Sequence, residues 1–242
     1  LKIFINLTRL NRPIGYLLLF WPCSWGLAYA YSFDLNIENF LSYIILFFLG
    51  AVLMRSAGCI VNDIVDIKLD KKVKRTKSRP LAANLISVKK SLVYVVGLCG
   101  LAFCILIQFN YLTIILGLSS MFLAFSYPFM KRITYWPQLF LGITFNIGVL
   151  ISFSAVTSSI NLSIVFLYCS GIFWTLGYDT IYAHQDKEDD LKIGVKSTAI
   201  LFGANSKKMI SFFYLMMFAC LFLYGITAGN SIYYFISLLF VG

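Results

Sequence analysis

Long apolar segments recur along the chain with short polar breaks between them. Most approach the ~20 residues that a helix needs to cross the hydrocarbon core of a bilayer. Because lipid offers no partner for exposed backbone groups, segments this long and apolar are expected to be helices. The pattern predicts seven spans and the start of an eighth, near residues 13–32, 39–61, 88–107, 111–127, 135–153, 160–178, 208–228 and from 231 onward.

The pattern therefore predicts an all-α, polytopic transmembrane helix bundle. Composition agrees, because 60% of the 242 residues are hydrophobic and only 12% are charged, against about 25% charged in soluble domains. The six cysteines form no CxxC pair and are interpreted as small buried apolar residues. The sequence opens on Leu1 and ends inside an apolar run, so we expect further residues at both ends.

The basic residues lie in alternate loops. Apart from Arg55, every Lys and Arg falls in residues 1–12, 62–90, 131–132 or 187–208. The intervening loops near 33–38, 108–110, 154–159 and 229–230 contain none. This positive-inside pattern predicts that the N-terminus and the long loops lie on the cytoplasmic (or matrix) side. Membrane orientation then explains most of the net charge of +10. The charge is therefore no indication of nucleic-acid binding, which is not expected.

The first acidic motif follows the second span. Asn62, Asp66 and Asp70 step by four residues, and Asp63 adjoins them. If the helix continues past the membrane edge, the three residues share one helical face, where like charges repel. A Mg²⁺ ion, bound by one or two carboxylates together with substrate phosphates, would remove this conflict.

A second acidic motif follows the sixth span. Asp179, Asp186 and Asp190 are spaced by seven and four residues, which again predicts one helical face and a second Mg²⁺ site beside one diphosphate. The alternative is that these carboxylates are solvated loop charges or helix caps. Zinc is disfavoured because neither motif has a cysteine, and His184 is the only histidine.

Basic residues near the motifs are candidates for the diphosphate itself. Arg75 and Arg79 follow the first acidic motif, and Lys131 and Arg132 end the fourth span. Arginine binds phosphate through a planar fork of donors. The alternative for such residues is anchoring to lipid headgroups.

Arg55 lies within an otherwise apolar span, nearly two helical turns before Asn62. An intramembrane arginine is costly and usually functional. We interpret it as the partner of a substrate carboxylate, deeper than the acidic motif; the alternative is that it extends to the interface.

These residues resemble a known family. The pattern Asn62-Asp63-x-x-Asp66-x-x-x-Asp70 resembles the first signature of the UbiA superfamily of intramembrane prenyltransferases, and Asp186-x-x-x-Asp190 resembles its second. The flanks resemble the branch that prenylates 4-hydroxybenzoate, across nearly the whole chain. They are Arg12-Pro13-Ile14-Gly15, Trp21-Pro22-Cys23-Ser24-Trp25-Gly26, Arg55-Ser56-Ala57-Gly58-Cys59, Arg75-Thr76-Lys77-Ser78-Arg79-Pro80-Leu81, Tyr127-Pro128-Phe129-Met130-Lys131-Arg132, Gly177-Tyr178-Asp179-Thr180-Ile181-Tyr182-Ala183 and Lys196-Ser197-Thr198-Ala199-Ile200-Leu201-Phe202-Gly203.

The resemblance implies a single domain, 1–242, with nine helices around a central cavity, the ninth lying beyond this sequence. Loops 62–90 and 179–207 would cap a site for Mg²⁺, a polyprenyl diphosphate and 4-hydroxybenzoate in ubiquinone synthesis, in a bacterial or mitochondrial inner membrane. No obligate protein partner is expected. The implied roles are catalysis by Asp66, Asp70, Asp186 and Asp190; Mg²⁺ binding by these four with Asn62, Asp63 and Asp179; diphosphate binding by Arg75, Arg79, Tyr127, Lys131 and Arg132; and acceptor binding by Arg55 and Asn62.

Two alternatives to this function stay open, and a third is disfavoured. An enzyme of the same family could act on a different aromatic acceptor. A transporter would also combine intramembrane charge with many helices, although the acids here cluster at one membrane face and not at the midplane. CDP-alcohol phosphotransferases are also Asp-rich membrane proteins, but their Asp-Gly-x-x-Ala-Arg core is absent.

Overall fold

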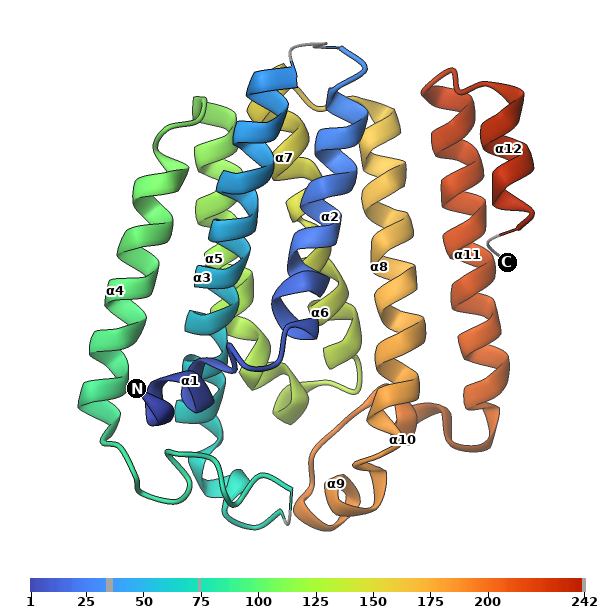
Figure 1. The fold of residues 1–242 in the computed structure, drawn as a ribbon. Helices are drawn as coiled ribbons and strands as arrows, with labels where there is room; N and C mark the ends of the chain where they lie inside the picture. Colours follow the sequence, from blue (N-terminus) through green and yellow to red (C-terminus); the bar gives the residue numbers. More distant parts are fainter. Residues whose placement is uncertain (34–36, 74, 241–242) are drawn as a thin grey trace.

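A computed structural model describes residues 1–33, 37–73 and 75–240, and no strand occurs among them (Figure 1). The helices form one bundle whose long members run side by side. In chain order they are α1 (Lys2–Thr8), α2 (Ile14–Ala30), α3 (Ile37–Asp70), α4 (Val88–Leu106), α5 (Tyr111–Ile133), α6 (Pro137–Asn146), α7 (Gly148–Thr157), α8 (Leu162–Ala183), α9 (Lys187–Ile193), α10 (Thr198–Phe202), α11 (Ser206–Thr227) and α12 (Ile232–Leu238), with a 3₁₀ turn at Gly203–Asn205.

The predicted transmembrane bundle is confirmed. Within the described residues, six helical stretches are long and apolar enough to cross a membrane, and α2 is a shorter apolar helix. Helix α12 corresponds to the start of the predicted eighth span, and residues 241–242 lie outside the described part. The first acidic motif is helical as predicted, because α3 continues for 34 residues to Asp70.

Polar N-caps set where three of the long helices begin. The side chains of Ser87, Asn110 and Asn161 accept hydrogen bonds from the backbone N–H three residues ahead, at the starts of α4, α5 and α8. Each bond satisfies a backbone donor that the helix itself leaves unpaired.

The span predicted at 135–153 is not one continuous helix. Helices α6 and α7 meet at Ile147, and the last residue of α6, Asn146, is buried there. Its Nδ2 donates to the carbonyl of Gly142 and to Thr175 Oγ1 of α8, both at 2.8 Å. A side chain that binds both its own helix and a neighbour stabilises this interruption. The interruption adjoins Phe145, which faces the interior of the bundle.

The basic loops all lie at one end of the bundle, as the charge pattern requires. Helix α1, the segment after α3 and helices α9 and α10 gather at the lower end of Figure 1. We call residues 71–87 the first cap segment and residues 184–197 the second; residue 74 lies outside the described residues. Lys196 ties the second segment to α5, its backbone N–H donating to the Lys131 carbonyl at 2.8 Å. Which side of the membrane this end faces stays a prediction.

An apolar cluster fixes the start of the chain against this end. Leu7 of α1 packs with Ala57 and Ile60 of α3, Leu81 of the first cap segment and Val95 of α4. Burial of these side chains stabilises the position of α1, which brings the residue after it, Arg9, beside the acidic motif.

Candidate active site

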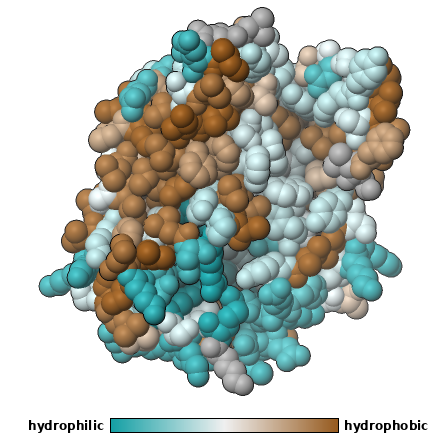
Figure 2. Space-filling view, viewed as in Figure 1, coloured by the Kyte–Doolittle hydropathy of each residue, from teal (hydrophilic) through white to brown (hydrophobic). Residues whose placement is uncertain are grey.

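A cavity of about 1290 Å³ extends from the capped end into the bundle. Helices α2, α3, α5, α6 and α8 line it, together with both cap segments. On the face shown in Figure 2, hydrophilic residues gather at the lower end, and hydrophobic residues cover much of the surface above. The cavity lining includes charged residues at the capped end, such as Asp66, Asp70 and Arg75, and many apolar ones within the bundle, such as Leu19 and Leu141.

One stripe of the acidic motif on α3 faces this cavity. Asn62, Asp66 and Asp70 all line it, as their spacing of four predicts. Asp63 is not among the lining residues; it is 1% exposed and turns toward α1. The helical period thus separates Asp63 from the residues with which it was grouped.

Asp63 is held by two arginines. Its Oδ1 lies 2.5 Å from Arg9 Nη2 and 3.2 Å from Arg79 Nη1. Arg79 also reaches both oxygens of Asp70, at 2.9 and 3.0 Å. The first cap segment is therefore tied to two turns of α3, and one arginine predicted for diphosphate is already bound to the acidic motif.

Asp66 pairs with the end of α5. It forms an ion pair with Lys131 and a second with Arg132, whose Nη2 lies 3.2 Å from its Oδ1. Arg132 also donates to the Val65 carbonyl at 2.8 Å. Lys131 lines the cavity, whereas Arg132 is not among the lining residues. The two adjacent cations thus approach Asp66 from different directions.

The prediction that Asp179, Asp186 and Asp190 share one helical face is wrong. Helix α8 ends at Ala183, and a new helix, α9, begins at Lys187 after Asp186. The first turn of α9 carries Glu188, Asp189 and Asp190, and acidic residues favour a helix N-terminus because of its partial positive charge.

Asp186 and Asp190 nevertheless reach the same cavity as the motif on α3. Arg75 binds Asp186 through two hydrogen bonds, Nε to Oδ1 at 3.1 Å and Nη2 to Oδ2 at 2.6 Å. Burial raises the pKa of Asp190 to about 6, and the Asp186 charge acts in the same direction, while Lys131 and Arg75 oppose it. Lys131 of α5 and Arg75 of the first cap segment thus both stabilise negative charge on the second acidic motif.

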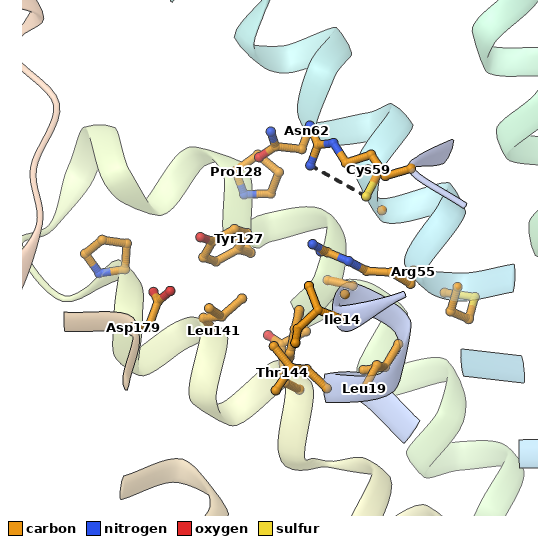
Figure 3. A pocket seen from close by; sticks show the side chains of 18 of the residues that line it. Ile14, Leu19, Arg55, Cys59, Asn62, Tyr127, Pro128, Leu141, Thr144 and Asp179 are labelled. Carbon is orange, nitrogen blue, oxygen red and sulfur yellow. Dashed lines mark hydrogen bonds between the residues drawn. The ribbon is translucent and has the colours of Figure 1, made fainter. Parts of the chain in front are cut away.

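Asp179 lies deeper, on α8, and lines the cavity. In Figure 3 it lies on the same side as Tyr127 and Leu141, apart from Asn62. Tyr127, predicted beside the diphosphate, also lines the cavity and lies between Asp179 and Arg55 in this view.

Arg55 lies deeper in the bundle than the acidic motif, as its place seven residues before Asn62 on α3 predicts, and both residues line the cavity (Figure 3). Arg55 Cζ lies 5.3 Å from the centroid of the Phe145 ring. Among the described residues no carboxylate forms an ion pair with it, in contrast to Arg9, Arg75 and Arg79. The guanidinium is therefore free to meet an anionic ligand.

Two residues of this site were missed by the sequence prediction. Arg9 lies in the basic N-terminal segment 1–12, whose charge was attributed to the positive-inside pattern and not to a site. Phe145 is one of 23 phenylalanines, so its residue type carried no signal.

The lining residues fit Mg²⁺. The available donors are oxygens, which Mg²⁺ prefers, and Mg²⁺ needs only one or two carboxylates when phosphates supply the rest. Within the described residues no three His, Cys, Asp or Glu side chains converge as a closed cluster, which disfavours an all-protein metal cage. The second oxygen of Asp63 is buried without a hydrogen-bond partner. Basic side chains form ion pairs with three of the carboxylates that line the cavity, Asp66, Asp70 and Asp186. A phosphate-bound cation would take the place of these basic side chains.

Fold and site define an integral membrane protein with a capped cavity, in which acidic and basic side chains surround the mouth and one arginine lies deeper. The chain belongs to the UbiA prenyltransferase family, whose model matches residues 19–242.

Sequence relatives are named for one activity. The mitochondrial 4-hydroxybenzoate polyprenyltransferase of Bos taurus is 49% identical over 243 residues, which cover all of this chain and 65% of the relative. The proteins of the same name from Homo sapiens and Arabidopsis thaliana are 46% and 48% identical, covering 100% and 97% of this chain and 65% and 58% of the relatives. The chain thus spans less than two thirds of the length of these curated relatives.

Solved structures share the fold. A UbiA homolog from Archaeoglobus fulgidus bound to GPP and Mg²⁺ aligns with a TM-score of 0.80 at 16% identity, covering 99% of this chain and 83% of that one. The apo UbiA homolog from Aeropyrum pernix K1 aligns with a TM-score of 0.78 at 21% identity, covering 92% and 83%.

Proposed function

We propose that this protein transfers a polyprenyl group from polyprenyl diphosphate to the ring of 4-hydroxybenzoate, ortho to the hydroxyl, in ubiquinone biosynthesis. The observation that carries the proposal is that two acidic motifs distant in sequence, with Asp66 and Asp186, line one cavity that also holds an arginine without an ion pair among the described residues. The identity to relatives named for this activity supports the choice of acceptor.

The basic residues at the mouth would bind the diphosphate. Arg75, Arg79 and Lys131 line the cavity and carry donors suited to phosphate oxygens. Arg132 and Tyr127 lie on the same helix as Lys131. The present partners of Arg75, Arg79 and Lys131 are carboxylates. A diphosphate bound with its cation could replace these pairs, its oxygens binding the basic side chains and the cation binding the carboxylates.

Asn62, Asp66, Asp70, Asp186 and Asp190 line the cavity and are the residues we propose to hold Mg²⁺. When bound, Mg²⁺ would stabilise the negative charge that develops on the departing diphosphate. Metal binding by Asp63 and Asp179 stays a prediction, because Asp63 turns away from the cavity and Asp179 lies deeper, within α8.

The reaction breaks the allylic C–O bond and forms a C–C bond to the ring carbon, which then loses its proton. Positive charge develops on the prenyl carbon, so water must be excluded. The helix bundle supplies that exclusion. Arg55 would bind the acceptor carboxylate deeper in the bundle than the diphosphate site, so that the acceptor ring faces the prenyl carbon.

The decisive experiment is an assay of membranes containing the protein, with Mg²⁺, a polyprenyl diphosphate and a panel of aromatic acids and neutral phenols. We expect prenylated 4-hydroxybenzoate by mass spectrometry, and its loss in Arg55→Ala. If only another acceptor were prenylated, that compound would replace 4-hydroxybenzoate as the proposed substrate. Uptake of radiolabelled solute into vesicles without any product would favour the transporter. An inner-membrane location, mitochondrial as in the relatives' names, stays part of this proposal.

A further inference from the structure

The position of Arg55 depends on a glycine of the neighbouring helix. Gly15 is the second residue of α2, and a methyl group added to it would lie 2.8 Å from Arg55 Nε. That is closer than real Cβ atoms approach other atoms. Any side chain at this position would therefore displace the guanidinium, so the absence of one creates the space in which it lies.

On another helix, an aromatic ring contacts the same group. Arg55 Cζ lies 5.3 Å from the Phe145 ring centroid, within the range of a cation–π interaction. Phe145 precedes Asn146, whose hydrogen bond to Thr175 at 2.8 Å fixes this turn of α6 against α8. The Phe145 ring therefore belongs to a turn of α6 whose position is fixed by a hydrogen bond to α8.

These two contacts hold the guanidinium without neutralising it. The cations at the cavity mouth are held by carboxylates, whereas the described residues offer Arg55 no ion pair. A glycine and an aromatic ring restrict where it lies and leave its charge available. Such a group favours a ligand that carries a planar anion, because arginine binds a carboxylate through two parallel hydrogen bonds.

We propose that Gly15 and Phe145 are positioning residues for Arg55 and that they set the preference of the site for anionic over neutral ring acceptors. This inference rests on the proposed function, because it concerns the acceptor of the same reaction. Neither residue touches the reacting atoms; both act through the guanidinium.

The test compares 4-hydroxybenzoate with its neutral analogue 4-hydroxybenzamide in the wild type and in Gly15→Ala, Phe145→Leu and Phe145→Tyr. The readout is the ratio of kcat/KM for the acid to that for the amide. We expect a fall of at least about tenfold in Gly15→Ala and Phe145→Leu, chiefly through a higher KM for the acid. Phe145→Tyr keeps the aromatic face and should stay within about twofold of the wild type.

Two controls separate positioning from general damage. Phe140→Leu makes the same change on α6 at a residue outside the cavity lining and should leave the ratio unaltered. The KM for the prenyl diphosphate should stay the same in every variant. A wild-type ratio retained in Phe145→Leu and Gly15→Ala, or a ratio equally lowered in Phe145→Tyr, would overturn this inference alone. A wild type that prenylates neither acceptor would overturn the proposed function and the inference with it.

Discussion

Arg75 and Asp186 join the two cap segments across the mouth of the cavity. Two hydrogen bonds, at 3.1 and 2.6 Å, connect residues 111 positions apart in sequence. The side chains are 48% and 25% exposed. Exposed ion pairs contribute only about 0–1 kcal/mol to stability, so this pair is poorly suited to holding the fold together and well suited to exchanging partners when a diphosphate binds.

Arg75→Ala should therefore separate activity from stability. We expect kcat/KM for the prenyl diphosphate to fall at least about tenfold, which corresponds to one lost charge-assisted contact of roughly 1.5–3 kcal/mol. The thermal unfolding midpoint of the detergent-solubilised protein should shift by no more than about 4 °C. Both quantities can be measured on the same purified sample.

Reversing the pair shows which role matters. The double variant Arg75→Asp with Asp186→Arg keeps an ion pair between the cap segments but moves the cation to the other side of the mouth. Because the variant also lacks Asp186, a proposed Mg²⁺ ligand, activity should stay low if either residue binds the diphosphate or its cation. Recovery of wild-type activity would mean that the pair only closes the cap.

The first acidic motif could be predicted from sequence because its spacing is the period of the helix that carries it. Asn62, Asp66 and Asp70 had to share a face once α3 continued to Asp70. The second motif could not be predicted in the same way. A spacing of seven and four residues fits a continuous helix and a broken one equally well. The acidic residues in the first turn of α9 favour the start of a new helix at Lys187.

Pairings between distant elements were hidden from sequence for a different reason. The contact of Arg9 with Asp63 depends on where Leu7 packs, which no local pattern encodes. The contact of Phe145 with Arg55 likewise depends on the interruption at Ile147. In each pair one residue could be recognised from sequence, Asp63 by its place in the acidic motif and Arg55 as a charge in an apolar span, whereas its partner carried no signal.

Metal dependence should distinguish the carboxylates that face the cavity from those that do not. Asp66→Asn and Asp190→Asn should raise the Mg²⁺ concentration for half-maximal activity by at least about tenfold, because each removes a charged ligand. Removal of Mg²⁺ with EDTA should abolish wild-type turnover and readdition should restore it. Activity is followed as prenylated product at a series of Mg²⁺ concentrations.

The second cap segment provides a matched control for this experiment. Asp189 adjoins Asp190 but forms an exposed ion pair with Lys192 at 3.9 Å and does not line the cavity. Asp189→Asn should therefore leave the Mg²⁺ requirement unaltered. Equal effects of Asp189→Asn and Asp190→Asn would indicate a general influence of charge, and the assignment of Asp190 as a ligand would be abandoned.

The interruption between α6 and α7 should be sensitive to loss of one hydroxyl. Thr175→Val removes the oxygen that accepts from Asn146 Nδ2 at 2.8 Å, in a buried site where water cannot replace it. We expect a loss of about 1–3 kcal/mol in the free energy of unfolding. Thr175→Ser keeps the hydroxyl and should lose less; equal losses in the two variants would point to packing instead of the hydrogen bond.

Arg9 should prove structural, although it lies beside the acidic motif. Asp63 is 1% exposed, and its charge is compensated by Arg9 at 2.5 Å and Arg79 at 3.2 Å. Arg9→Met would leave a buried carboxylate with one cation, which we expect to cost about 1–3 kcal/mol. Lys2→Met, a loss of charge at an exposed residue of α1, the helix that Arg9 follows, should change stability by less than about 0.5 kcal/mol.

A double-mutant cycle isolates the charge itself. Asp63→Asn removes the carboxylate, so adding it to Arg9→Met should cost less than it does in the wild type, with a coupling of about 0.5–3 kcal/mol. The cycle is measured by thermal or denaturant unfolding, with prenyltransfer assayed in parallel. Additive losses would mean that Arg9 stabilises α1 through packing alone. A loss of activity in Arg9→Met that exceeds its loss of stability would instead place Arg9 among the residues that bind the diphosphate.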